Sequence, residues 1–143
     1  MGDWGVNMKI SQMLLGLLLG SSVTAAAWSV TAADADKLGK ELLPTGGERT
    51  QLVFVRHKGF VEGQDWIQIE SPIARLDEID ARTLLELAED WVVGGAAAVG
   101  GLAVFRHSAP LEDLSFAEFD EPFRLVTHAA DEIEHKLTGG DRY

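Results

Sequence analysis

The sequence predicts a small α+β domain over residues 51–143, with an antiparallel sheet and helices packed against it. Short segments of β-branched and aromatic residues are separated by glycines, which is typical of β-hairpins. Between and after these segments, apolar residues recur every three or four positions, which is typical of amphipathic helices. A chain of 143 residues has room for one such core.

Composition and charge narrow the classes of function. Apolar residues make up 46% of the chain and charged residues 24%, which are ordinary values for a folded domain. The 23 acidic residues outnumber the 12 Lys and Arg residues, and the net charge of −11 repels nucleic acid and favours basic partners. The chain has no cysteine, so disulfides and thiolate chemistry are excluded.

The amino-terminal segment has the pattern of a secretory signal. Lys9 precedes a leucine-rich run over residues 10–20, and the small residues that follow place cleavage between residues 27 and 33. The run is shorter than the ~20 residues that span a bilayer. We expect residues 1–33 to be a signal peptide, with Met8 as an alternative start because no basic residue precedes it. The protein is then periplasmic or secreted if the signal is used, and otherwise cytoplasmic.

Residues 34–50 are expected to form a short helix and a linker. Residues 34–43 have helical character, and the sequence PTGG that follows them ends the helix. With the leader before it, the stretch ADADKLGKEL at residues 33–42 resembles the start of mature periplasmic proteins related to outer-membrane lipoprotein-sorting factors. This resemblance covers about residues 8–48 and implies export only.

Two hairpins are predicted in the domain. Residues 52–55 and 66–70 form the first, with a glycine-containing loop between them. The pair of glycines at 100–101 marks the turn of the second, before a strand over residues 102–105. A phosphate-binding loop is disfavoured at these glycines because no Lys followed by Ser or Thr succeeds them.

Two amphipathic helices complete the domain. The first follows Asp77, and its apolar face comprises Leu84, Leu87, Ala88 and Trp91. The second begins with a capping box formed by Ser115 and Glu118. Because proline costs about 3 kcal/mol inside a helix, we expect the first turn to break and the main helix to start near Pro122. Its apolar face comprises Phe123, Val126, Ala130, Ile133 and Leu137.

The candidate residues for chemistry do not form a recognisable site. His128, Glu132 and His135 have helical spacing that makes metal binding conceivable, but they lie opposite the apolar face, where a hydrated surface is the commoner outcome. His57 and His107 end strands with no nucleophile arranged beside them. We therefore expect a protein that is not an enzyme, with no catalytic residue, no cofactor and no metal.

Five segments occur in an order that resembles a known family: WIQIESP at 66–72, LLELA at 84–88, VVGG at 92–95, FRHSAPL at 105–111 and LTGGDRY at 137–143. They resemble the YbjN family, which is related to type III secretion chaperone-like proteins and includes sensory transduction regulators. The resemblance implies an antiparallel sheet with helices, no enzymatic activity, and a tendency to dimerise or to hold a partner's extended segment. The family has a helix and a strand where this chain has its leader and residues 34–43, which predicts a sheet without its first strand.

The sequence therefore predicts a non-enzymatic, chaperone-like or regulatory module that binds a protein partner or forms a homodimer. Binding would use an apolar sheet surface and the open edge left by the missing strand. We expect neither nucleic acid nor a small-molecule substrate. The alternative, suggested by the leader alone, is an exported envelope protein that handles lipids or lipoproteins. The partner-binding surface is expected to comprise Leu52, Phe54, Trp66, Ile67, Ile69, Leu102 and Val104.

Overall fold

A computed structural model of the chain describes residues 30–61 and 63–143. The predicted α+β class is confirmed. The predicted signal peptide lies outside the described residues except for its last four positions. In chain order the elements are α2 (Ala32–Leu38), β1 (Lys40–Gly46), β2 (Arg49–Val61), β3 (Gln64–Arg75), the 3-10 helix η2 (Leu76–Glu78), α3 (Ala81–Ala88), β4 (Gly95–Val99), β5 (Leu102–Pro110) and α4 (Phe116–Thr138).

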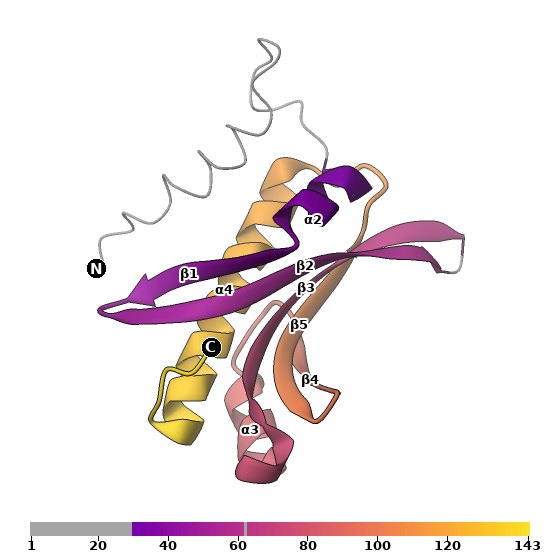
Figure 1. Cartoon of the computed structure of the whole chain (residues 1–143). Coiled ribbons are helices and arrows are strands. Elements are labelled where there is room, and N and C mark those ends of the chain that lie inside the picture. Colours follow the sequence, from indigo (N-terminus) through magenta and orange to yellow (C-terminus); the bar gives the residue numbers. More distant parts are fainter. Residues whose placement is uncertain (1–29, 62) are drawn as a thin grey trace.

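The strands form one antiparallel sheet in the order β1-β2-β3-β5-β4 (Figure 1). Both predicted hairpins are confirmed, as β2–β3 and β4–β5. The second turns at Gly100 and Gly101, whose φ values of 54° and 83° match a two-residue type I′ turn. Glycine adopts these positive φ values without steric cost, which explains the glycine pair at this turn.

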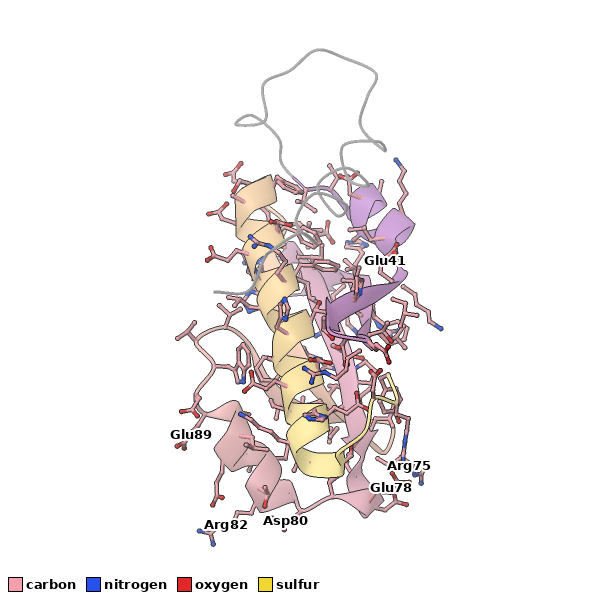
Figure 2. The ribbon with its side chains drawn as sticks, turned by 90° about the vertical axis from the view of Figure 1, so that its left-hand side faces the viewer. Glu41, Arg75, Glu78, Asp80, Arg82 and Glu89 are labelled. Atoms are coloured by element: carbon pink, nitrogen blue, oxygen red, sulfur yellow. The ribbon has the colours of Figure 1, made fainter. Side chains whose placement is uncertain are left out.

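The helices pack on one face of the sheet. Alternate residues of β2 and β3 point toward them, and Val53, Val55, Ile67 and Ile69 are at most 2% exposed. The long helix α4 runs behind the sheet in Figure 1 and along it in Figure 2, mainly against β3, β2 and β5. All three α-helices of the described residues contribute to the same hydrophobic cluster; from α2 come Ala35 and Leu38, from α3 comes Leu84, and from α4 come Phe119, Phe123, Val126, Ala129, Ala130 and Ile133.

The capping box at the start of α4 is confirmed. Ser115 Oγ accepts a hydrogen bond from the Glu118 amide at 3.3 Å, and Glu118 Oε2 accepts one from the Ser115 amide at 2.9 Å. The predicted break at Pro122 is wrong, because α4 continues through it. Phe119 and Phe123 lie on either side of the proline, are 1% exposed and stack with ring centroids 5.5 Å apart. Burial of these rings offsets the cost of one proline.

The predicted loss of the first strand is also wrong. Residues 40–46 form β1, which pairs with β2 from Lys40 opposite Phe54 to Gly46 opposite Arg49. Gly39 ends α2 with a φ of 46°, and its carbonyl accepts a hydrogen bond from the Val55 amide at 3.0 Å. This bond joins the helix end directly to the sheet, so a strand follows where the sequence suggested a helix and a linker.

Two carboxylates of α4 are buried, and they differ in their partners. Asp131 is 4% exposed and accepts two hydrogen bonds from Arg49 of β2, Nε to Oδ1 at 3.1 Å and Nη2 to Oδ2 at 2.8 Å. Glu134 is 1% exposed and accepts a hydrogen bond from the Arg142 amide at 2.7 Å. Within the described residues Glu134 has no cationic partner, so it is the costlier of the two buried charges.

We predict that Glu134→Gln stabilises the fold at neutral pH. Burial raises the pKa of the Glu134 carboxyl above its ordinary value of 4.5. In acid below both pKa values the group is neutral in the folded and unfolded chains, so it contributes no penalty. As the pH rises through 4.5 and then through the raised value, the folded chain must carry a buried charge and loses stability. Glutamine keeps an acceptor for the Arg142 amide without this loss.

Urea unfolding of both proteins across this pH range checks the prediction. The two should be equally stable below about pH 4, and the variant should be more stable at about pH 7. Glu132→Gln is the matched control, because Glu132 is exposed and pairs with Lys136. A gain for Glu134→Gln that is the same in acid and at neutral pH would contradict the assignment.

Candidate partner-binding surface

The sheet face opposite the helices carries side chains that no described helix covers, and we call it the open face. Its residues are fixed by the antiparallel register, because alternate positions of each strand share a face. None of the open-face residues in the next sentence belongs to the hydrophobic cluster under the helices. On β1, β2, β3 and β5 the open face includes Lys40, Leu42, Leu52, Phe54, Arg56, Lys58, Trp66, Gln68, Glu70, Pro72, Leu102, Val104, Arg106 and Ser108.

A row of directly opposed residues crosses the middle of the open face. Lys40 lies opposite Phe54, Phe54 opposite Glu70, and Glu70 opposite Arg106. The row ends on β4 at Gly95, which is opposite Arg106. Directly opposed positions place side chains in contact range, so this row puts one carboxylate between an aromatic ring and a guanidinium.

Glu70 holds two arginines at the centre of the open face. Arg106 donates from Nε to Glu70 Oε2 at 2.9 Å and also from Nη2 to the same oxygen. Arg56 Nη2 lies 3.8 Å from Glu70 Oε1. The Glu70 side chain is 7% exposed, whereas those of Arg56 and Arg106 are 51% and 29% exposed. The carboxylate is therefore the floor of the cluster, and the two guanidinium groups face solvent.

Phe54 joins this charged cluster to the apolar part of the open face. The Arg56 guanidinium lies 5.0 Å from the centre of the Phe54 ring, and Lys40 Nζ lies 5.9 Å from it. Both distances are within the range of cation–π attraction. In the neighbouring row Leu42 lies opposite Leu52, and Leu42 is 61% exposed. Aromatic, aliphatic and cationic groups thus form one continuous surface.

The structure divides the seven residues predicted from the sequence between the two faces of the sheet. Leu52, Phe54, Trp66 and Leu102 are half-buried on the open face, and Val104 lies on the same face but is 2% exposed. Two others, Ile67 and Ile69, are 1% and 2% exposed in the core beneath the helices. A partner on the open face has no access to these two isoleucines, so they are not part of the surface defined here.

The prediction from the sequence missed Leu42 and every charged residue of this surface, including Lys40, Arg56, Lys58, Glu70 and Arg106. The sequence predicts a helix over residues 34–43, and a helix does not bring Leu42 opposite Leu52, as the strand β1 does. The alternation of Trp66, Gln68 and Glu70 with buried isoleucines was a usable signal for the face on β3.

The sheet has two edges, β1 and β4. On β1, Lys40, Pro44 and an irregular register between Pro44 and Gly46 hinder the addition of another strand. By contrast, β4 has the sequence GAAAV, which contains no charge and no proline, and its register with β5 is regular. The unprotected edge is therefore β4, and not the edge of β2 expected from the sequence.

The turn fixes which backbone groups of β4 point outward. In a two-residue type I′ hairpin the residues that flank the turn, Val99 and Leu102, form a hydrogen-bonded pair, and such pairs alternate along the ladder. Ala97 therefore bonds toward β5, whereas the N–H and C=O groups of Ala96 and Ala98 face away from it. No backbone bond outside the ladders joins these two alanines to another described residue.

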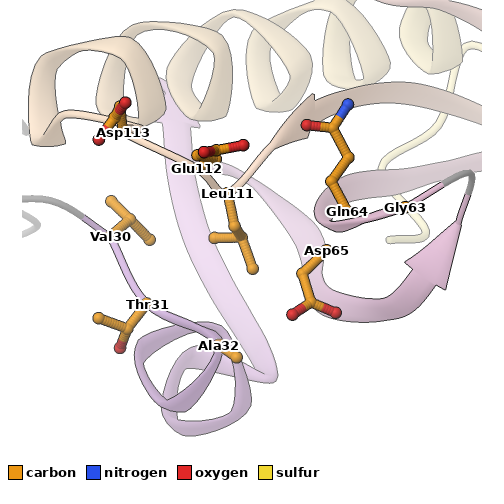
Figure 3. A pocket seen from close by; sticks show the side chains of 9 residues that line it. All are labelled: Val30, Thr31, Ala32, Gly63, Gln64, Asp65, Leu111, Glu112 and Asp113. Carbon is orange, nitrogen blue, oxygen red and sulfur yellow. The ribbon is translucent and has the colours of Figure 1, made fainter.

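A surface pocket of about 440 Å³ lies between the start of α2, the start of β3 and the loop before α4 (Figure 3). Its acidic lining residues are Asp65, Glu112 and Asp113. Figure 3 shows that Glu112 and Asp113 point away from Asp65, which lies 3.1 Å from His57 Nε2. No group of metal ligands is assembled among the described residues. The pocket offers no converging set of polar groups.

Two of the candidate histidines, and two serines of the strands, lie in surroundings that explain them structurally. Burial lowers the pKa of His107 and of His128 below the ordinary 6.5, which favours their neutral forms. Ser71 is buried and donates a hydrogen bond to the Leu52 carbonyl at 2.6 Å. Ser108 accepts one from Gln68 Nε2 at 3.1 Å.

Comparison with known proteins adds no family name: no protein-family model and no curated protein matches the chain. Among the described residues, every helix is too short or too polar to span a bilayer.

Proposed function

We propose that the chain is a non-enzymatic protein-binding module whose open face receives a segment of a partner protein. The observation that carries this proposal is the exposed Leu42, beside Leu52 and Phe54, on a sheet face that no described helix covers. Contiguous apolar and aromatic side chains at a surface are typical of binding sites. A chaperone-like or regulatory role, as the resemblance to the YbjN family implies, fits such a surface.

The β4 edge gives this module a second means of holding an extended segment. The outward N–H and C=O groups of Ala96 and Ala98 can pair with the backbone of an added strand. Their methyl side chains leave an approaching backbone unobstructed. The occupant is a partner segment; a second copy of the chain is the competing occupant, and sedimentation over a range of protein concentrations separates the two.

Two leucines with nearly equal exposure provide the test of the open face. Leu42 on the open face is 61% exposed, and Leu85 on α3 is 62% exposed. We expect Leu42→Ser to lose partners that the wild type retains in affinity capture from cell extract, and Leu85→Ser to retain them. Equal retention by both variants would reject the open face as the binding site. Thermal unfolding of each variant shows that both remain folded.

Export of the module is part of the proposal, and it is supported by the leader in the sequence. The contacts of Val30 support cleavage before this residue, because Val30 is 8% exposed in the core and its amide donates a hydrogen bond to the Leu114 carbonyl at 2.7 Å. Thr31 caps α2. Cleavage after Ala27 keeps both residues, whereas cleavage after Ala33 removes them. We expect the periplasmic fraction to contain a protein whose intact mass corresponds to a chain that begins at Trp28. Uncleaved protein in the cytoplasm would contradict export.

A further inference from the structure

The open face is locally cationic in a strongly acidic protein. Four of the chain's 12 Lys and Arg side chains, namely Lys40, Arg56, Lys58 and Arg106, lie on its central part, and Arg75 lies at its end, opposite Leu102. Glu70 is the single carboxylate among the open-face residues. Two guanidinium groups share this carboxylate, and within the described part of the chain Lys40 and Lys58 have no carboxylate at ion-pair distance. The surface therefore carries excess positive charge.

Cations elsewhere in the described chain are balanced differently. Six other cations each contact at least one carboxylate, in the pairs Arg49–Asp131, Arg75–Asp77, Arg82–Glu86, Arg124–Asp120, Lys136–Glu132 and Arg142–Glu78. Arg75 also lies 3.8 Å from Glu78, so Arg75 and Arg142 have two carboxylates between them. Among the described cations away from the central part of the open face, only Lys37 has no carboxylate at ion-pair distance. The imbalance thus belongs to the open face and does not follow from the composition, which has a net charge of −11.

We infer that the partner segment is an acidic, extended peptide that alternates carboxylates with apolar side chains. This inference rests on the proposed function of the open face. Glu70 holds Arg56 and Arg106 in place from beneath, so the cost of ordering them is already met before a ligand arrives. Their solvent-facing guanidinium groups suit carboxylates, which they can bind through two parallel hydrogen bonds.

The apolar residues of the open face favour an acidic peptide over a nucleic acid as the partner. Leu42 and Leu52 lie in the row next to the cations, and they match the apolar side chains of a strand with a period of two. A polyphosphate gains nothing from these leucines, because its backbone carries no apolar side chains to place on them. The net charge of the chain favours a basic partner, but the local charge of the open face favours an acidic one. The local charge decides, because electrostatic complementarity acts where the two surfaces meet.

Three short labelled peptides test the inference with the full chain, by fluorescence anisotropy. They alternate Leu with Glu, with Gln or with Lys. The Glu peptide should bind about tenfold more tightly than the Gln peptide, with an affinity that falls as salt is raised, and the Lys peptide should bind least. The double variant Lys40→Glu with Arg56→Glu should lose about tenfold in affinity for the Glu peptide.

Arg82→Glu is the matched control, since Arg82 is 86% exposed on α3 and points into solvent (Figure 2). It should leave the affinity for the Glu peptide unchanged. Equal affinities for the Glu and Gln peptides, no binding of any peptide, or equally tight binding of an oligothymidylate would overturn the acidic partner. If Leu42→Ser still loses its captured partners in that case, the proposed function stands and only the partner chemistry fails.

Discussion

Arg49→Met should destabilise the fold strongly, because it leaves Asp131 charged and unpaired beneath α4. The Asp131 side chain is 5% exposed, and its two hydrogen bonds from Arg49 are 3.1 and 2.8 Å long. Removing one partner of a buried pair costs about 3–5 kcal/mol, and we expect the lower end of this range. The reason is that the Arg49 side chain is 37% exposed, so water can approach the vacated site.

Urea unfolding of Arg49→Met and of a matched pair on the surface measures this effect. Arg82 and Glu86 are 2.8 Å apart, like Arg49 and Asp131, but their side chains are 86% and 59% exposed. Arg82→Met should therefore change the free energy of unfolding by less than about 1 kcal/mol. The double variant Arg49→Met with Asp131→Leu should be more stable than Arg49→Met alone, because it removes the stranded charge. Equal losses for Arg49→Met and Arg82→Met would contradict the account.

Phe123→Ala should lower the free energy of unfolding by about as much as Arg49→Met, in this case through loss of packing. Phe123 is 1% exposed on α4, stacks on Phe119 and lies in the cluster that joins the helix to the sheet. Truncating a buried phenylalanine costs about 3–5 kcal/mol, a large part of the ~5–15 kcal/mol that stabilises a domain.

Phe116, in the first turn of α4, is the matched control for Phe123. It is only half-buried at the edge of the same cluster, so Phe116→Ala should cost less. Urea unfolding of both variants measures the two losses in the free energy of unfolding. A smaller loss for Phe123→Ala than for Phe116→Ala would mean that α4 is not anchored to the sheet as described.

Local patterns in the sequence were sufficient for most elements. The Ser115–Glu118 capping box, the glycine turn at 100–101 and the apolar stripe from Phe123 to Leu137 each depend on a few neighbouring residues. Pro122 and β1 were predicted wrongly because their outcome depends on tertiary packing. The rings of Phe119 and Phe123 hold the helix together around the proline, and pairing with β2 makes a strand of residues that also suit a helix.

The residues of the open face likewise could not be predicted from local sequence patterns alone. A period of two separates Trp66, Gln68 and Glu70 from Ile67 and Ile69, but α4 determines which set is buried. The cluster of Arg56, Glu70 and Arg106 joins three strands, and only their register brings these residues together. Spacing along the sequence does not carry that information.

Two tryptophans on opposite faces report most directly on the claim that the open face binds the partner. Trp66 lies on the open face, whereas Trp91 packs edge-on against Phe105 on the helix face, with ring centroids 6.2 Å apart. The NMR signals of their indole N–H groups can be followed while the purified partner from the Leu42 comparison is added. We expect the Trp66 signal to shift and the Trp91 signal to stay in place. A shift of Trp91 with Trp66 unchanged would contradict binding at the open face.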